Sequence, residues 1–211
     1  MKIKNIRQSV FETNSSSTHC IVINKEDAFL IDDSYKTCIN RSNDKIEFTL
    51  DGEYGWHNEK LINLSEKLSY IFCCILDTKL NCIFTDDIEN EKQSKLELRK
   101  TQINQIEQIY DDINDLVYKT TGYEIYCENY NELVSKVKMG IEDYETELSG
   151  YVDHADTKYF GIVDPLLNNK EDLHKFLFDS KSVLYMTNDN RDNEGTEYDF
   201  DTLNYQYYGG N

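Results

Sequence analysis

Three apolar stripes repeat at the spacing of an α-helix and constrain the fold of this chain more than any other feature. The first stripe consists of Leu61, Leu64, Leu68, Ile71 and Ile75. The second, in a helix expected over residues 93–119, consists of Ile103, Ile106, Tyr110, Ile113 and Val117. The third consists of Val134, Val137, Ile141, Tyr144 and Leu148. Side chains three and four positions apart share one helix face. Each stripe needs a partner surface, so we expect the helices to pack against one another and against a sheet.

Shorter apolar segments between turn residues predict the strands of that sheet. The expected strands cover residues 2–11, 20–24, 28–31, 36–40, 45–50, 158–163 and 182–187. A short helix is expected over 170–178, and residues 194–211 form either an edge strand or a disordered acidic and aromatic tail. We predict a single α+β domain over residues 1–211, in which a mixed or antiparallel sheet from the N-terminal and C-terminal segments packs against the three amphipathic helices.

The chain is strongly acidic, with 40 Asp and Glu against 22 Lys and Arg and a formal net charge of −18. Residues 141–211 carry 16 acidic and 5 basic residues, a net of −11, whereas residues 1–140 carry a net of −7. A field of this sign repels nucleic acids and anionic membranes and attracts basic surfaces. The acidity therefore argues against direct binding of DNA, RNA or membranes. The negative charge indicates a partner with a basic surface, or it serves only to keep the protein soluble.

The cysteines and the apolar segments indicate the cellular compartment of the protein. The chain has six cysteines: Cys20, Cys38, Cys73, Cys74, Cys82 and Cys127. They form no CxxC pair, so buried thiols in a reducing compartment fit better than disulfides or a zinc site. No run of 18 apolar residues is present, and charges interrupt the N-terminal segment, so we expect neither a membrane span nor a signal peptide. These features predict a cytoplasmic protein without a metal or cofactor.

A polar cluster from Glu12 to His19 lies between two of the expected strands. Its hydroxyl, amide and imidazole groups are suited to hold a phosphate, a sugar or a protein partner by several hydrogen bonds. The binding residues expected there are Asn14, Ser15, Ser16, Ser17, Thr18 and His19. The alternative is that the polar side chains satisfy the backbone of a tight turn and that His19 is a structural hydrogen-bonding residue.

Ser16 and His19 are also candidates for catalysis. A histidine has an ordinary pKa of about 6.5 and can exchange protons at neutral pH. A serine nucleophile needs a base and an orienting group within hydrogen-bond reach, and the sequence identifies neither. The GxSxG elbow of serine hydrolases and a glycine-rich phosphate loop are both absent from the sequence.

A second cluster, Asp153-His154-Ala155-Asp156, follows Gly150-Tyr151-Val152. Two carboxylates beside an imidazole can bind a divalent cation or carry out acid–base chemistry, which makes Asp153 and His154 further catalytic candidates. A metal phosphoesterase needs additional ligands from distant segments, and an acidic chain produces such neighbourhoods by chance. A charged turn is therefore the preferred interpretation, and no metal is expected.

The segment from Arg7 to His19, which contains the motif VFETNSSSTH, resembles the opening of a group of proteins encoded by phages and mobile elements of Firmicutes-type bacteria. Gly150 to His154 is similar to a Gly-Tyr-x-Asp-His segment of that group, and Phe176 to Val183 is similar to a late segment. The resemblance covers about a fifth of the chain. It implies a phage or mobile-element origin and leaves the activity open.

Two classes of function follow from these observations. The first is an acidic inhibitor, such as an anti-CRISPR protein, that binds a basic nucleic-acid-binding protein or nuclease complex of the host and occupies its nucleic-acid channel. The residues expected to bind the partner are Glu194, Glu197, Tyr198, Asp199 and Asp201, in which carboxylates alternate with a stacking ring. The alternative is a small enzyme that acts on a nucleotide or phosphoester, with the polar cluster and Asp153-His154 in one pocket.

Overall fold

The computed structural model describes residues 17–26, 31–54, 59–81, 92–139, 151–152, 163–188 and 205–210. The expected strands 2–11 and 28–31 lie almost wholly outside these ranges. Within them the chain is α+β, as predicted, with both parallel and antiparallel strand pairs. The prediction of a single domain over residues 1–211 stays a prediction.

The largest sheet combines the first described strand with the last two. Its order is β5 (Glu59–Leu61), β8 (Val183–Asn188), β1 (Ser17–Asn24) and β9 (Tyr205–Gly210), and every neighbouring pair is antiparallel. Ser17 lies opposite Asn188 at one end of β1, and Asn24 lies opposite Tyr205 at the other. Segments from both ends of the chain therefore build the sheet, as expected, and β9 assigns part of the C-terminal tail to an edge strand.

Two small sheets complete the strand pairing. The first has the order β2 (Ile39–Asn40), β3 (Lys45–Glu47) and β6 (Ile125–Tyr126), and β3 runs parallel to β6. The second pairs β4 (Glu53–Tyr54) with β7 (Tyr151–Val152) in parallel. Each of these parallel pairs joins segments that are far apart along the chain.

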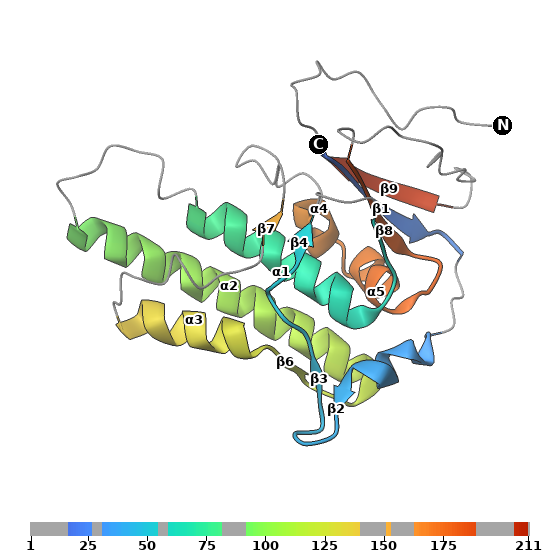
Figure 1. Cartoon of the computed structure of the whole chain (residues 1–211), viewed down its shortest axis with the longest axis horizontal. Helices are drawn as coiled ribbons and strands as arrows, with labels where there is room; N and C mark the ends of the chain where they lie inside the picture. Colours follow the sequence, from blue (N-terminus) through green and yellow to red (C-terminus); the bar gives the residue numbers. More distant parts are fainter. Residues whose placement is uncertain are drawn as a thin grey trace, which may run out of the picture.

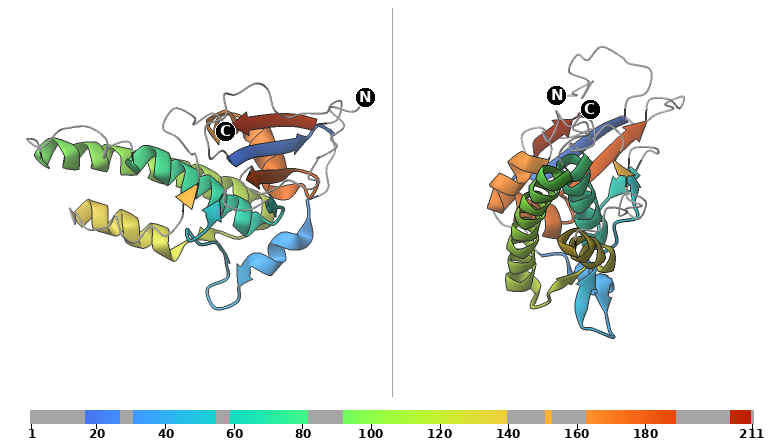
Figure 2. Two further views of the ribbon diagram at one scale, coloured as in Figure 1. Left: turned by 45° about the horizontal axis from the view of Figure 1, so that its top comes forward. Right: turned by 90° about the vertical axis from the view of Figure 1, so that its left-hand side faces the viewer.

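Five α-helices and one short 3₁₀ helix lie among the described residues. They are η1 (Asp33–Cys38), α1 (Leu64–Asn81), α2 (Lys92–Thr121), α3 (Glu128–Met139), α4 (Val163–Asn168) and α5 (Lys170–Phe178). Figures 1 and 2 show α1, α2 and α3 side by side, with the four-stranded sheet near the start of α1 and over α5. None of the described helices combines the length and apolar character that a membrane span requires.

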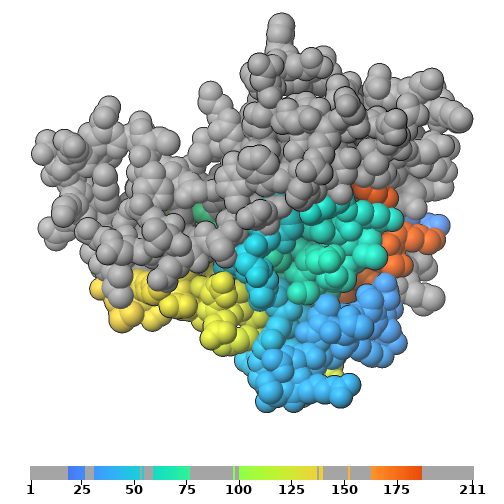
Figure 3. Space-filling view, in the orientation of Figure 1, coloured from blue at the N-terminus to red at the C-terminus, as the bar shows by residue number. Residues whose placement is uncertain are grey.

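Figure 3 shows where η1, β2 and β3 lie relative to the helices. The blue surface of η1, β2 and β3 lies directly below α1 and beside the yellow surface of α3. Asp32 begins η1, because its carboxylate accepts the Ser34 N–H at 2.9 Å. Its own backbone N–H donates to the Phe178 carbonyl at 3.0 Å, which ties η1 to the end of α5.

The core forms mainly around α1, whose residues from Lys67 to Leu76 are all buried. Ile21 and Ile23 of β1 join the main hydrophobic cluster with α1 and α5, whereas Cys20 and Val22 join a second cluster with Val183. Successive strand residues point to opposite faces of a sheet. Burial on both faces explains why the sequence of β1 is a continuous apolar run rather than an alternating one.

Three of the expected elements lie close to their predicted bounds. The helix expected over 93–119 is α2, the one over 170–178 is α5, and the strand over 182–187 is β8, shifted by one residue. In the third stripe Val134 belongs to α3, while Ile141, Tyr144 and Leu148 lie outside the described residues.

Several predicted boundaries were wrong, including the end of the strand expected over 45–50, which is Glu47. Leu61 is the last residue of β5 rather than part of the first helix. Residues 36–38 end a 3₁₀ helix instead of starting a strand, and Val163 begins α4 instead of ending a strand. The strand expected from residue 20 begins at Ser17, because β8 extends far enough to pair with it.

The described cysteines agree with the expectation of buried thiols. Cys20, Cys73, Cys74 and Cys127 are buried thiols, and Cys38 is a half-buried one. Burial raises the pKa of the Cys20 and Cys127 thiols to about 11, so both stay protonated at neutral pH. Cys82 lies outside the described residues.

Candidate functional site

The polar cluster enters the protein core at its last residue. Asn14, Ser15 and Ser16 lie outside the described residues, and Ser17 and Thr18 are described only as backbone of β1. His19 is 3% exposed, and its Nδ1 lies 2.9 Å from the Tyr70 hydroxyl of α1. The two rings stack with their centroids 5.7 Å apart. This environment gives His19 a structural hydrogen bond and little access to solvent.

Tyr70 connects His19 to a second buried tyrosine. The Tyr54 ring meets Tyr70 edge-on, with centroids 5.3 Å apart, and the Tyr54 hydroxyl donates to Ser69 Oγ at 2.7 Å. Burial raises the pKa of both tyrosines above the ordinary value, so their hydroxyls stay protonated. The result is a layer of hydroxyl and imidazole groups along one side of α1.

This layer brings the two sequence motifs toward the same part of the fold. Tyr54 pairs with Val152, the last described residue before Asp153. Tyr54 also contacts Tyr70, which bonds His19. The residue that ends the polar cluster and the strand that leads into Asp153-His154 are thus both adjacent to the same turn of α1. Asp153 and His154 themselves lie outside the described residues.

The most densely bonded polar group of the described core is Lys67, which the sequence analysis did not single out. Its side chain is 0% exposed. The Nζ atom lies 2.6 Å from the Phe176 carbonyl, 2.7 Å from the Ser182 carbonyl and 3.5 Å from the Asp179 carbonyl. Burial lowers the pKa of Lys67 to about 7, and the nearby Asp179 carboxylate opposes that shift. Lys67 therefore joins α1 to the turn between α5 and β8.

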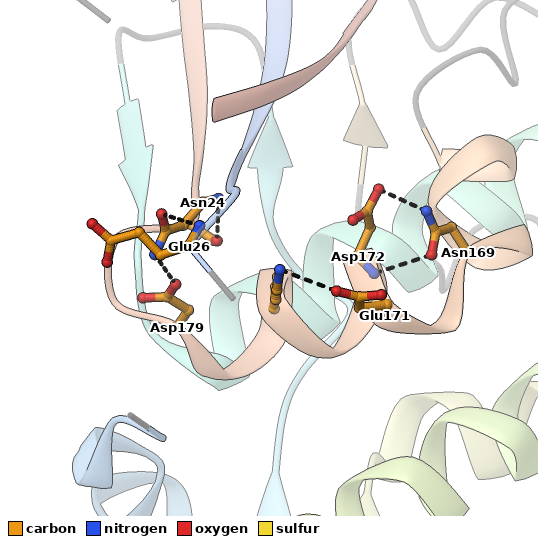
Figure 4. A network of polar contacts seen from close by, with 8 residues as sticks. Asn24, Glu26, Asn169, Glu171, Asp172 and Asp179 are labelled. Atoms are coloured by element: carbon orange, nitrogen blue, oxygen red, sulfur yellow. Dashed lines mark hydrogen bonds and ion pairs between the residues drawn. The ribbon is translucent and has the colours of Figure 1, made fainter. Parts of the chain in front are cut away.

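Asp179 and Asn24 extend this polar junction to the central strand. Figure 4 shows the Asn24 amide directed at the Asp179 carboxylate, to which it donates at 2.7 Å. The second carboxylate oxygen of Asp179 accepts the Lys181 N–H at 2.9 Å, and the Asn24 N–H donates to Ser182 Oγ at 3.0 Å. We call Lys67, Asn24, Asp179 and Ser182 the α5–β8 junction; all four are buried.

The other polar contacts in Figure 4 have a local structural role. Asn169 caps α5, because its Oδ1 accepts the Asp172 N–H at 3.3 Å and its amide donates to the Asp172 carboxylate at 2.8 Å. Lys175 pairs with Glu171 at 3.1 Å one helical turn away. These contacts fix the start and the first turns of α5 and thereby position its last carbonyls around Lys67.

Lys67 carries a sequence signal that could have identified it. It lies three residues after Leu64 and four before Ile71, so helical spacing places it on the apolar face of the first stripe. A lysine on a core face either extends its ammonium to the surface or needs buried acceptors. The acceptors here are carbonyls more than 100 residues away along the chain, which spacing alone does not reveal.

The residues expected to bind the partner, Glu194, Glu197, Tyr198, Asp199 and Asp201, lie outside the described residues, between β8 and β9. In the described part of the chain no group of three or more His, Cys, Asp or Glu side chains is placed to hold a metal ion.

Comparisons with protein-family models, with curated proteins and with solved structures found no match.

Proposed function

We propose that this protein is an acidic inhibitor of phage or mobile-element origin that acts in the host cytoplasm. It binds a host-defence nuclease complex of the CRISPR type and occupies its basic nucleic-acid-binding surface. The observation that carries the proposal is the distribution of charge. The described residues contain 22 acidic and 17 basic residues, a net of −5, so the rest of the chain contains 18 and 5, a net of −13.

Many described charges are matched by neighbours of opposite sign. Lys138 pairs with Glu107 at 2.6 Å, Lys45 with Glu124 at 2.8 Å, and Lys181 with Glu26 at 2.8 Å. Such exposed pairs contribute little stability, but they cancel charge at short range. The described residues thus carry little net charge, and most of the acidic excess belongs to the residues outside them.

Three connections hold most of that excess. Residues 82–91 and 140–150 each carry four acidic and no basic residues, and residues 189–204 carry six acidic and one basic residue. The first connection begins and ends at one pole of the molecule and the second begins there, because α1 ends, α2 begins and α3 ends at that pole (Figures 1 and 2). A basic surface is attracted to such concentrations of one sign, which favour fast and salt-dependent association.

A competition experiment tests this proposal. Purified nuclease complex with its guide RNA is mixed with target DNA and with increasing amounts of the protein, and DNA binding is measured. We expect the protein to displace DNA, and we expect the combined variant Glu194→Gln, Glu197→Gln, Asp199→Asn and Asp201→Asn to displace it at least about tenfold less well.

The matched control removes four charges from exposed positions of the described framework. It carries Asp44→Asn, Asp111→Asn, Asp112→Asn and Glu128→Gln. If charge between β8 and β9 recognises the partner, the control displaces DNA almost as well as the unmodified protein. Equal losses in both variants would show that only net charge matters, and no displacement by the unmodified protein would refute the proposal.

One observation favours the second candidate, an enzyme acting on a nucleotide or phosphoester. His19 and the strand that leads to Asp153 both border the same turn of α1 through Tyr70 and Tyr54. The enzyme hypothesis predicts that Ser16→Ala and His154→Ala abolish phosphoester hydrolysis, while the four-acid variant keeps it. The inhibitor hypothesis predicts the opposite ranking of these variants in the competition experiment.

A further inference from the structure

One face of the four-stranded sheet is buried, although no described helix contributes to its hydrophobic cluster. Cys20 and Val22 of β1 and Val183 of β8 are 4%, 1% and 3% exposed, respectively. They form a cluster separate from the main core, and the partly buried residue that packs against it, Tyr185, also belongs to β8. We call the side of the sheet that carries Cys20, Val22 and Val183 the second face.

The opposite face of the sheet is filled by helices. His19 bonds Tyr70 of α1, and Ile21 and Ile23 belong to the main cluster together with residues of α1 and α5. Successive residues of β1 thus point to opposite sides, as a strand requires. The described helices explain the burial of these odd-numbered residues but not that of the second face. The cover of the second face therefore comes from residues outside the described ranges.

The cover lies over the centre of the sheet rather than over its β5 edge. Lys60, Tyr185 and Cys20 are neighbours in register across β5, β8 and β1, so their side chains lie on the same face. Lys60 is exposed, Tyr185 is half-buried and Cys20 is buried. Exposure thus falls from the β5 edge toward β1, the strand that lies between β8 and β9.

The strand directions require the chain to return along the sheet between β8 and β9. Both strands flank β1 and are antiparallel to it, so they run parallel to each other. β8 ends at Asn188, opposite Ser17, and β9 begins at Tyr205, opposite Asn24. The return covers about 24 Å, the length of β1 from Ser17 to Asn24. The connection 189–204 spans up to about 50 Å when extended, which is ample.

The second face offers the direct route for this connection. Parallel strands of one sheet are joined by a crossover over a face of the sheet. Because α1 and α5 fill the opposite face, a direct crossover from β8 to β9 passes over β1 on the second face. This is also the part of the sheet at which the burial of Cys20 and Val22 needs a cover.

The sequence of the connection has a pattern that suits an apolar surface. The segment Glu197-Tyr198-Asp199-Phe200-Asp201 alternates carboxylates with aromatic rings. In an extended chain, neighbouring side chains point to opposite sides, so the two rings share one side and the three carboxylates share the other. Burial favours the rings, whereas the carboxylates need water.

We propose that the second face is the docking surface for the connection 189–204, with the rings of Tyr198 and Phe200 on the sheet and the three carboxylates of residues 197–201 in solvent. This assignment gives Tyr198 a role within the protein, whereas the sequence analysis expected its ring to bind the partner. Docking also holds the carboxylates in one row, which lowers the cost of ordering them when a basic surface binds. Only this last step rests on the proposed function.

Alkylation of Cys20 in the folded full chain tests whether the rings cover the second face. Iodoacetamide is the probe, and mass spectrometry of the peptides gives the labelling rate of each cysteine. We expect the double variant Tyr198→Ser and Phe200→Ser to label at Cys20 about tenfold faster or more than the unmodified protein, because its cover opens locally. Cys74 of α1 is the internal reference, and its labelling rate should not change, because it is buried in the main core.

A matched control changes the other side of the same segment. The variant Glu197→Gln, Asp199→Asn and Asp201→Asn should leave the labelling rate of Cys20 unchanged. The pair Val10→Ser and Phe11→Ser examines the N-terminal segment as an alternative cover. Faster labelling of Cys20 in that pair but not in the ring variant would overturn the proposal, as would equal rates in the ring variant and the unmodified protein.

Should the ring variant unfold, both cysteines label quickly, and NMR of the unmodified protein decides the question. Nuclear Overhauser effects between the ring protons of Tyr198 or Phe200 and the methyl groups of Val22 or Val183 support the docking, and their absence contradicts it. Neither measurement uses the nuclease complex. Docked rings in a protein that does not displace DNA would therefore refute the inhibitor proposal and leave the docking intact.

Discussion

Asn24 shows what a single buried side chain does for this fold. Its amide donates to Asp179 at 2.7 Å, its Oδ1 accepts the Glu26 N–H at 3.2 Å, and its own N–H donates to Ser182 at 3.0 Å. Asp179 is buried, with 4% of its surface exposed, so solvent does not replace a donor that is removed. Asn24→Ala should therefore lower the free energy of unfolding by about 2 kcal/mol, the usual value for a hydrogen bond to a charged group.

Chemical unfolding of Asn24→Ala beside a matched variant measures this cost. Asn43 makes a hydrogen bond of the same length to a carboxylate, that of Glu47, but at the protein surface. Asn43→Ala should change the free energy of unfolding by less than about 0.5 kcal/mol, because water replaces the amide. If both variants lowered the free energy of unfolding by a similar amount, burial at the α5–β8 junction would not increase the contribution of the hydrogen bond.

For single residues, the sequence predicted which side chains are buried better than it predicted which residues they contact. The burial of Cys20, Cys73 and Cys74 follows from their apolar surroundings in the sequence. The bond from His19 to Tyr70 does not, because it joins positions 51 residues apart. The role of Lys67 was missed for the same reason, since its acceptors come from a turn that only tertiary packing brings to α1.

At the scale of elements, α2 illustrates how the local sequence determines where a helix ends. The helix stops at Thr121, and Gly122 follows with a φ of 82° while its N–H donates to the Tyr118 carbonyl at 2.8 Å. This left-handed conformation suits glycine and strains residues with a Cβ atom. Gly122→Ala should lower the free energy of unfolding by about 1 kcal/mol, measured by thermal or chemical unfolding.

Ser135→Ala is a useful comparison for that variant. Ser135 is exposed within α3, where alanine has a higher helix propensity than serine. The same kind of change, to alanine, should leave stability unchanged or raise it slightly there. A Gly122→Ala protein as stable as the unmodified one would mean that the end of α2 does not depend on the glycine.

Helices with an apolar periodicity were predictable from the sequence, whereas the two-residue strands were not. The boundaries of α2 and α5 agree with their apolar periodicity and their flanking residues. The two-residue strands β2, β4, β6 and β7 have no periodicity to detect, and they form because distant segments meet. Ser17 and Thr18 belong to β1 because strand pairing uses backbone groups, so polar side chains do not prevent it.

For the whole molecule, the α+β class and the origin of the large sheet were predicted correctly, since they depend on the order of many elements rather than on any one boundary. The candidate site was less predictable. The polar cluster and Asp153 belong to segments far apart in sequence, and the layer between them, Tyr54 and Tyr70, has no motif of its own. The net charge of the chain follows directly from its composition, so it could be obtained without the structure.

The charge of the whole molecule also gives the most direct test of the proposed function. The dissociation constant for the isolated nuclease complex should be measured by titration between about 50 and 200 mM salt, because salt screens exposed charges over this range. We predict that the affinity falls about tenfold or more across it, and that the fall is smaller for the variant with Glu194, Glu197, Asp199 and Asp201 neutralised. An affinity that is independent of salt, or an identical salt dependence for that variant, would contradict the central claim that acidic residues between β8 and β9 recognise a basic surface.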